Sequence, residues 1–336
     1  LAGVGLTIAA PIAGALVLGA AILGGIYGGE FAQELYELTG DVDENGRMDI
    51  LDRIETLAIG QDIKLNEIPE EFKKKAVTLH DGEISLDSLI ENAYKDAAYR
   101  YALRDLNVFI AKGADYKYYN ANDSLDLWSK EHPGGMTESY IRDRSAMLLL
   151  LLRYLKNGLK LSRNLVDGTV KGDWDYLDYG KKPFQGDDKR PLELSIDGQG
   201  IMTDNHRIAF GTAIINKRDI LEGSKREDHL YGLGGDDELI SKGGSDYLEG
   251  GTGRDTYVIS SKDDGVDTIF DADGNGVFKV DGEELTNLTF TYQSDNGKMP
   301  DTVYAKDNKY RFKRIVDNTW ELGILIKDKL YKSLAH

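Results

Sequence analysis

The chain contains no cysteine among its 336 residues. Disulfide bonds, thiolate metal sites and a cysteine nucleophile are therefore excluded. This absence is compatible with export of an unfolded chain that must not cross-link on the way. Basic residues are scarce too, with 41 Lys and Arg against 58 Asp and Glu and a formal net charge of −17. Nucleic acid is a poor partner for such a chain because phosphates need a basic surface, whereas cations or a basic partner are favoured.

Familiar catalytic motifs are missing as well. The five histidines do not form H-E-x-x-H, and the chain has neither a G-x-S-x-G elbow nor a G-x-x-x-x-G-K-[ST] loop. If the chain is an enzyme, a hydrolase with a site within residues 166–210 is the interpretation left open. Its weak catalytic candidates are Asp197, Asp204 and His206. The alternative is an entry segment to the repeats that follow, with Asp197 as an oxygen ligand and His206 in a hydrogen-bond network.

The first 29 residues contain no charge and many Gly and Ala residues. The run is long enough to span a bilayer, and small residues four apart favour close helix packing in lipid. A buried helical hairpin explains the same residues equally well. Because the chain begins with Leu1, we expect it to be a fragment or a processed piece of a longer protein.

Three further regions follow before the C-terminus. Residues 30–165 carry apolar residues at three- and four-residue spacing, which predicts helices. Within them "MLLLLLRYL" is too short to cross a membrane and predicts a buried core helix. Residues 166–220 are mixed, and the alternation in "LELSI" and "HRIAF" predicts short strands that lead into the repeat at residues 221–275. Residues 276–336 alternate apolar and polar side chains around turn signals, which predicts β-hairpins.

The repeat has a period of nine residues. The units GSKREDHLY, GLGGDDELI, SKGGSDYLE and GGTGRDTYV follow one another from Gly223, each with Asp at its sixth place and Leu or Tyr at its eighth. They approach G-G-x-G-x-D-x-U-x, with U a large apolar residue, in which six residues make a turn and three make a short strand. The U side chain enters the core of a coil, and glycines adopt backbone angles that a Cβ would forbid. A Gly/Asp-rich linker with accidental periodicity is the alternative.

In a two-sided coil, alternate turns lie on opposite edges. Asp237 is then predicted to share an edge with Asp255, and Asp228 with Asp246. Carboxylate and carbonyl oxygens form the cage that Ca²⁺ prefers. We expect the best site between GLGGDD and GGTGRD, and a weaker or incomplete one on the edge where Arg226 replaces a glycine. The predicted ligands in the repeats are Asp228, Gly232, Gly235, Asp237, Gly244, Asp246, Gly250, Gly253 and Asp255.

This unit resembles the RTX (repeats-in-toxin), or haemolysin-type, calcium-binding repeats of secreted bacterial proteins. The resemblance covers residues 223–258, with a looser continuation at Asp264 and Asp273. It implies a parallel β-roll, folding triggered by calcium outside the cell, and type I secretion. Because four repeats make a short roll, residues 276–336 are expected to cap it.

A second calcium signal lies in residues 41–52, "DVDENGRMDILD", which match the loop of an EF-hand. Its predicted ligands are Asp41, Asp43, Asn45, Arg47, Asp49 and Asp52. An acidic N-cap and turn is the alternative. A partner loop is expected around Gly82, where Val77, Leu79 and Ser88 replace ligands and Ile84 would pair with Met48.

Together these patterns predict an α+β multidomain protein: a mainly helical N-terminal part with an EF-hand-like pair, a short parallel β-roll, and an antiparallel β cap. The leading interpretation is the C-terminal region of a secreted toxin- or effector-like protein that binds calcium. Its partners would be membrane lipid or a target cell surface, or an immunity or chaperone protein that covers the apolar N-terminus. The rivals are the calcium-stabilised hydrolase and a calcium-dependent adhesin or interaction module.

Overall fold

The computed structural model describes residues 76–79, 84–107, 109–156, 171–180, 191–195, 205–213, 217–262, 265–285, 290–291, 302–305, 310–316, 319–326 and 329–335. Several predictions therefore lie outside the described residues. They are the membrane-seeking or buried segment 1–29, the EF-hand-like loop with all of its ligands, Gly82 of its expected partner loop, the pair Asp197 and Asp204, and Asp264.

Three helices form where the apolar spacing predicts them. They are α5 (Leu86–Lys95), α6 (Ala97–Asp105) and α7 (Glu138–Lys156). Ser85 begins α5 through a capping box with Ser88, and the Asp96 side chain accepts from the Ala98 amide to begin α6. These caps satisfy amides that have no partner inside the helix, so the chain breaks into two helices at Asp96.

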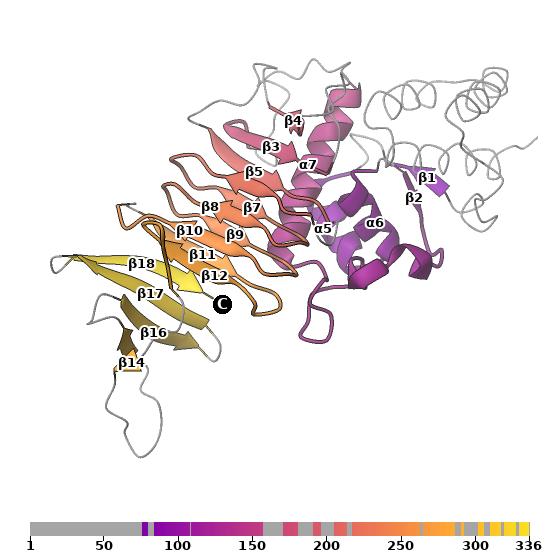
Figure 1. Cartoon of the computed structure of the whole chain (residues 1–336). Coiled ribbons are helices and arrows are strands. Elements are labelled where there is room, and N and C mark those ends of the chain that lie inside the picture. Colours follow the sequence, from indigo (N-terminus) through magenta and orange to yellow (C-terminus); the bar gives the residue numbers. More distant parts are fainter. Residues whose placement is uncertain are drawn as a thin grey trace, which may run out of the picture.

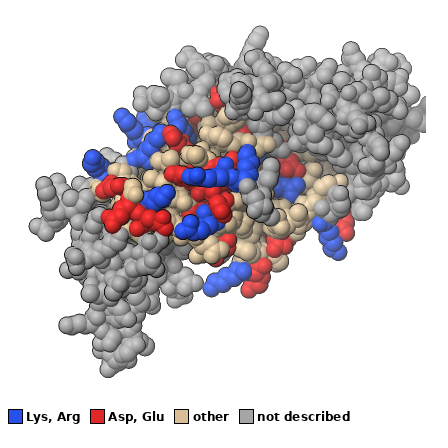
Figure 2. Space-filling view, viewed as in Figure 1, with Lys and Arg blue, Asp and Glu red and all other residues tan. Residues whose placement is uncertain are grey.

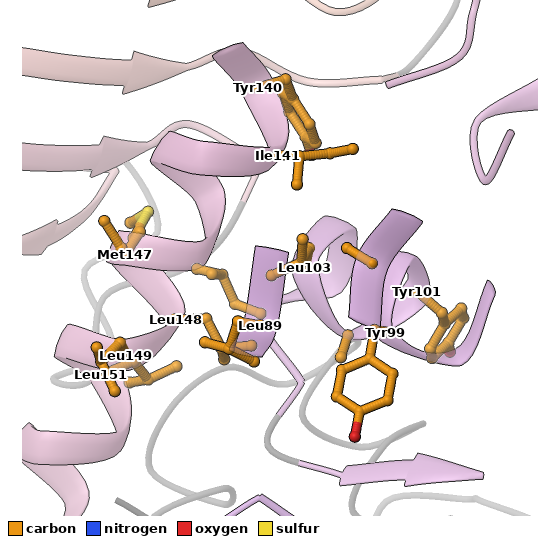
Figure 3. Close-up of a cluster of buried hydrophobic side chains, with 14 of the residues drawn as sticks. Leu89, Tyr99, Tyr101, Leu103, Tyr140, Ile141, Met147, Leu148, Leu149 and Leu151 are labelled. Carbon is orange, nitrogen blue, oxygen red and sulfur yellow. The ribbon is translucent and has the colours of Figure 1, made fainter. Parts of the chain in front are cut away.

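The run "MLLLLLRYL" forms the buried part of α7, as predicted. Met147 to Leu152 are at most 3% exposed. Leu148 and Leu149 pack with Leu89 of α5 and Leu103 of α6 in one cluster (Figure 3). Among the helices that the structure describes, none is both long and apolar enough to cross a bilayer. We call residues 84–156 the helical unit.

The helical unit shares one small sheet, which the sequence does not predict, with the segment before it. Strand β1 (Ala76–Thr78) pairs antiparallel with β2 (Phe109–Ala111). Two single 3-10 turns, η2 (Lys117–Tyr119) and η3 (Ala121–Asp123), follow before α7. In the expected partner loop of the EF-hand, Ser88 lies in the capping box of α5, and Met48 lies outside the described residues.

Residues 208–280 form a parallel β-solenoid, as the repeats predict, and its strands belong to two sheets (Figure 1). The short sheet has the order β13 (Glu283–Glu284), β12 (Val277–Val280), β10 (Thr256–Ile259), β8 (Glu238–Ile240) and β6 (Ile220–Glu222). The long sheet contains, in this order, β11 (Val266–Phe270), β9 (Tyr247–Glu249), β7 (His229–Tyr231), β5 (His206–Phe210), β3 (Trp174–Asp178) and β4 (Leu192–Leu194). Strands β4 and β5 are those predicted from "LELSI" and "HRIAF".

The interior of the solenoid is filled by the U residues of the repeats. Leu230, Leu239, Leu248 and Tyr257 are all fully buried and belong to one cluster. Leu221 and Ile269 extend this cluster at either end. Because one large side chain per nonapeptide fills the space between the sheets, the period of nine is a packing requirement of the coil.

The outer face of the long sheet packs against α7. Tyr140 of α7 meets Phe210 and Tyr231 edge to face, at 5.5 and 5.7 Å between ring centroids. The Arg144 guanidinium donates to Asp178 at 2.5 Å, and both side chains are buried. Helix α7 thus lies between the solenoid and the helices α5 and α6 (Figure 1).

Beyond the solenoid the long sheet continues into antiparallel strands. They are β18 (Lys329–Ala335), β17 (Thr319–Ile326), β16 (Tyr310–Val316), β15 (Thr302–Ala305) and β14 (Phe290–Thr291). Strand β18 pairs in parallel with β11, so these strands extend the same sheet.

Candidate metal centre

The register of the strands places the repeat turns on two edges. Glu238 pairs with Thr256 in the short sheet and His229 with Tyr247 in the long one, each a step of eighteen residues. The turns 232–237 and 250–255 therefore stack on one edge, which we call the first edge. The turns 223–228 and 241–246 stack on the other, the second edge. This is the arrangement that the nine-residue period predicts.

Aspartates link neighbouring coils along both edges. On the first edge, the Asp219 amide donates to Oδ1 of Asp237 at 2.7 Å, and the Asp237 amide to Oδ1 of Asp255 at 2.9 Å. On the second edge, the Asp228 amide donates to Oδ1 of Asp246 at 2.8 Å. The Asp at the sixth place of a unit thus accepts a hydrogen bond from the backbone of the preceding coil. We call these stacked carboxylates the aspartate ladder.

On the first edge, one carboxylate oxygen of Asp237 and one of Asp255 are left over. Oδ2 of Asp237 and Oδ2 of Asp255 are buried and have no hydrogen-bond partner among the described residues. A buried carboxylate oxygen without a partner is costly, because its lost hydration is not replaced. An oxygen-seeking cation bound in the turn would supply that partner.

The leading glycine of each turn leaves room for this oxygen. A Cβ on Gly232 would lie 2.8 Å from Oδ2 of Asp237, and one on Gly250 would clash with the Asp255 carboxylate. Each carboxylate is therefore held against the backbone of its own turn, in a space that any side chain at the glycine would fill. Both features fit an all-oxygen metal site.

Backbone conformation explains the other turn glycines. Gly235, Gly244 and Gly253 have φ of 125°, 108° and 128°, which side chains rarely adopt. The carbonyl oxygen of Gly235 points at Gly253 in the next coil, so closely that a Cβ there would clash. The carbonyls of Gly232 and Gly250 likewise point along the stack, each within 2.5 Å of where a Cβ on the preceding glycine would lie. The carbonyl oxygens of Gly232, Gly235 and Gly250, three of the five predicted carbonyl ligands, therefore point along the stack.

The second edge differs at its first turn. Asp228 already has protein partners on both oxygens: the amide of Arg207 at 2.6 Å on Oδ1, and the amide of Ser224 on Oδ2. The Ser224 hydroxyl adds a third bond at 3.1 Å. Serine thus replaces part of what a cation would supply, which agrees with a weaker site at GSKRED. Binding itself stays a prediction on both edges.

Burial sets the electrostatics of the first edge. It is the largest cause that raises the pKa of Asp237 to about 7 and that of Asp255 to about 7, with further increases from neighbouring aspartates. On the face seen in Figure 2, acidic and basic side chains are interspersed over the described surface. The ladder carboxylates Asp228, Asp237, Asp246 and Asp255 are at most 2% exposed and lie inside the turns. A cation bound there would favour their ionised form.

The ladder includes two aspartates that the nonapeptide pattern misses. Asp219 stands one coil before Asp237, and Oδ1 of Asp267 accepts from the Asp246 amide at 3.1 Å. The sequence signal for both is an Asp two places before a buried apolar residue, Leu221 or Ile269. Asp219 keeps the period, 18 residues before Asp237, but residues 214–222 contain no glycine. At Asp267 the period fails because the coil from β9 to β11 has a step of 21 residues. Asp267 therefore occupies the ladder position that an unbroken nine-residue period would give to Asp264.

At the first edge the ladder ends differently from the predicted continuation at Asp273. Val277 pairs with Thr256, so Gly276 occupies the place that matches Asp255. Asp273 instead accepts from the Gly253 amide at 3.0 Å and binds this turn from outside the ladder position.

One acidic cluster lies outside the repeats. Oδ2 of Asp123 and Oδ2 of Asp126 lie 3.3 and 3.7 Å from Nδ1 of His132, in the loop before α7. Their ligand atoms are close enough for one metal ion. The three side chains are 35–47% exposed, so this cluster supports a metal less strongly than the buried ladder does.

The hydrolase candidate His206 is held in the wall of the long sheet. Its ring stacks on Trp174 at 4.7 Å, and its Nδ1 lies 2.6 Å from the Glu227 carbonyl oxygen. These contacts correspond to the entry-segment interpretation of the sequence.

No protein-family model, curated protein or solved structure matches this chain. Functional inference consequently depends on the geometry of the solenoid and its turns.

Proposed function

We propose that the solenoid is a calcium-binding β-roll of the RTX type that folds when a secreted chain meets extracellular calcium. The observation that carries this proposal is the pair of buried Oδ2 atoms of Asp237 and Asp255, which have no hydrogen-bond partner among the described residues. Asp237 and Asp255 would hold the ion with carbonyl oxygens of the glycine turns. A ligand set of carboxylate oxygens and neutral carbonyl oxygens suits calcium best.

Folding and calcium binding would be the same event in this account. With 58 Asp and Glu against 41 Lys and Arg, the chain repels itself, and without an ion the ladder has to be buried uncompensated. Where calcium is scarce the roll would stay unfolded, which suits export. Where calcium is abundant, the free energy of binding becomes free energy of folding.

The strands β14 to β18 are proposed to cap the roll. Support comes from β18, which pairs with β11 at the end of the solenoid and so covers an otherwise open sheet edge. Open edges invite pairing with other chains.

The wider role rests on the resemblance to RTX proteins. It comprises secretion by a type I system, a toxin- or effector-like function, a membrane or cell-surface target, and a second calcium ion in the loop 41–52. The calcium switch is the part that the geometry supports.

A calcium titration of the full chain tests the switch. Far-ultraviolet circular dichroism would follow β-structure as calcium is added to the metal-free wild type and to the Asp237→Asn/Asp255→Asn variant. Asp236→Asn is the matched control, because Asp236 lies in the same turn but is exposed. We expect wild type and control to gain β-structure at similar calcium concentrations, and the double variant to need at least about tenfold more. A chain fully folded without calcium, with a variant that behaves like wild type, would show that the ladder is a scaffold without an ion.

A further inference from the structure

A cavity lies between the helical unit and the first edge of the roll. Its volume is about 260 Å³, small for a ligand pocket and suited to a group the size of one side chain. On one side it is lined by the loop before α7, including Met136, and on the other by turn residues, including Leu233 and Thr252. It exists only when the two parts are docked.

Most of the cavity wall is apolar. Met136, the Tyr140 ring and Leu233 face it from three different elements. Such a wall would accommodate a hydrocarbon stem, and it gains free energy when that stem leaves water.

The wall contains one buried acid with an unusual set of partners. Glu249 is 6% exposed, and its Oε2 accepts from the Thr137 hydroxyl at 2.7 Å and from the Tyr247 hydroxyl at 2.8 Å. Within the described part of the chain it forms no ion pair. Removing a buried carboxylate from water without a counter-charge is costly, so this acid favours a cation in the cavity beside it.

The one guanidinium in the cavity wall is already committed. Arg104 binds the Asp105 carboxylate through both Nε and Nη2, at 3.1 and 3.0 Å. Its Nη1 donates to the Tyr119 carbonyl oxygen at 2.7 Å and to the Ser124 hydroxyl at 2.8 Å. With Glu249 ionised, the charges of Arg104, Asp105 and Glu249 sum to a net negative one. Burial raises the pKa of Glu249 to about 7, and a cation beside it would favour the ionised form.

We propose that this cavity binds an alkylammonium group, with the nitrogen at Glu249 and the carbon stem along Met136 and Leu233. The group would be carried either by a small organic amine or by a lysine side chain of a peptide. Both present the same chemistry to the cavity. This proposal is independent of what occupies the aspartate ladder, and it requires only that the roll and the helical unit are folded together.

Calorimetric titration of the full chain, in saturating calcium, tests the proposal. The probes are n-hexylamine against n-hexanol, and acetyl-Gly-Lys-Gly-amide against the same peptide with norleucine. The variants are Glu249→Gln, which keeps an oxygen acceptor for Thr137 and Tyr247, and Ala121→Trp, which fills the cavity from an exposed wall position. Glu91→Gln is the charge control, since Glu91 is exposed on α5.

We expect at least one amine probe to bind about tenfold more tightly than its uncharged match, as for one charge-assisted hydrogen bond. Glu249→Gln should remove that preference, Ala121→Trp should remove binding, and Glu91→Gln should change neither. The arm that binds identifies the source, small amine or peptide. Equal binding of charged and uncharged probes, no saturable binding by either amine, or binding that survives Ala121→Trp would each overturn the proposal. If Glu249→Gln fails to fold by circular dichroism, Ala121→Trp and the paired probes still decide.

Discussion

The amide of Asp237 donates to Oδ1 of Asp255 at 2.9 Å, between neighbouring coils of the solenoid. Asp237 and Asp255 therefore have two tasks each: Oδ1 holds the neighbouring coil, and Oδ2 faces into its own turn. A substitution by Asn keeps the acceptor for the first task and removes the charge needed for the second. This separation makes the ladder suitable for mutational tests.

Asp255 on the first edge and Asp228 on the second should respond differently to loss of charge. Asp255→Asn should raise the calcium concentration at the midpoint of folding, because the free Oδ2 is the atom that a cation would bind. Asp228→Asn should shift that midpoint less, since both Asp228 oxygens already accept from protein groups. Calcium titrations followed by circular dichroism would measure both midpoints. Equal shifts would contradict the difference between the edges.

The stability of the calcium-free protein should fall as pH rises. The pKa of Asp237 and that of Asp255 are raised to about 7 in the folded chain, against about 3.9 for a free Asp, so the folded state holds more protons between these values. Their contribution is complete below about pH 4 and is lost as pH rises through about 7. Urea unfolding at pH 5.5 and pH 8 in a chelator would measure the difference.

Calcium should reverse this trend, because protons compete with the metal for carboxylates. The Asp237→Asn/Asp255→Asn variant serves as the control, and it should show a smaller pH dependence than wild type in both conditions. If the free energy of unfolding changes with pH as steeply in the variant as in wild type, the pH effect comes from groups other than Asp237 and Asp255.

Turn glycines should differ in how much they tolerate a methyl group. Gly253→Ala should destabilise strongly, because its φ is 128° and its Cβ would clash with the Gly235 carbonyl oxygen. Gly282→Ala is the matched control: its φ is 81°, and a Cβ there has nothing within 4 Å. It should cost only the backbone term of about 1–2 kcal/mol. Urea unfolding in saturating calcium would measure how much free energy of unfolding each variant loses. Equal losses would mean that the positive φ alone is responsible and that the clash at Gly253 contributes nothing.

Docking of the helical unit should depend on the buried pair Arg144 and Asp178. Asp178→Asn leaves the guanidinium buried without its counter-charge, and should lower the free energy of unfolding by about 3–5 kcal/mol. Lys95→Gln is a control, since its ion pair with Glu91 is exposed and should contribute little. Similar small losses for both variants, measured by urea unfolding, would contradict a structural role for the buried pair.

The nonapeptide pattern predicts the solenoid well because one constraint repeats. Leu230, Leu239 and Leu248 must fill the same narrow core, and glycines must adopt the same turn angles, so the sequence counts in nines. The edge assignment of Asp237 with Asp255 follows from the same count. Asp219 keeps the count, 18 residues before Asp237, but residues 214–222 contain no glycine, so the repeat pattern does not mark it. Asp267 escapes the count because its coil carries three extra residues, which break the period without breaking the ladder.

The docking of the helical unit could not be read from the pattern. Tyr231 and Tyr247 occupy variable places of the nonapeptide, yet Tyr231 is buried beneath α7 and its hydroxyl donates to Asp143 at 2.6 Å. A contact between residues 88 positions apart depends on the final arrangement of two units. The cavity beside Glu249 arises from the same docking and has no sequence signal of its own.

Counting the bound ions would show whether calcium occupies a site between Asp237 and Asp255. Equilibrium dialysis against radioactive calcium, with wild type, Asp236→Asn and Asp237→Asn/Asp255→Asn at equal protein concentration, would give the number of ions that each chain retains. The account predicts that wild type and Asp236→Asn bind the same number, and that the double variant binds at least one ion fewer. Equal numbers for all three chains would contradict a calcium site between Asp237 and Asp255.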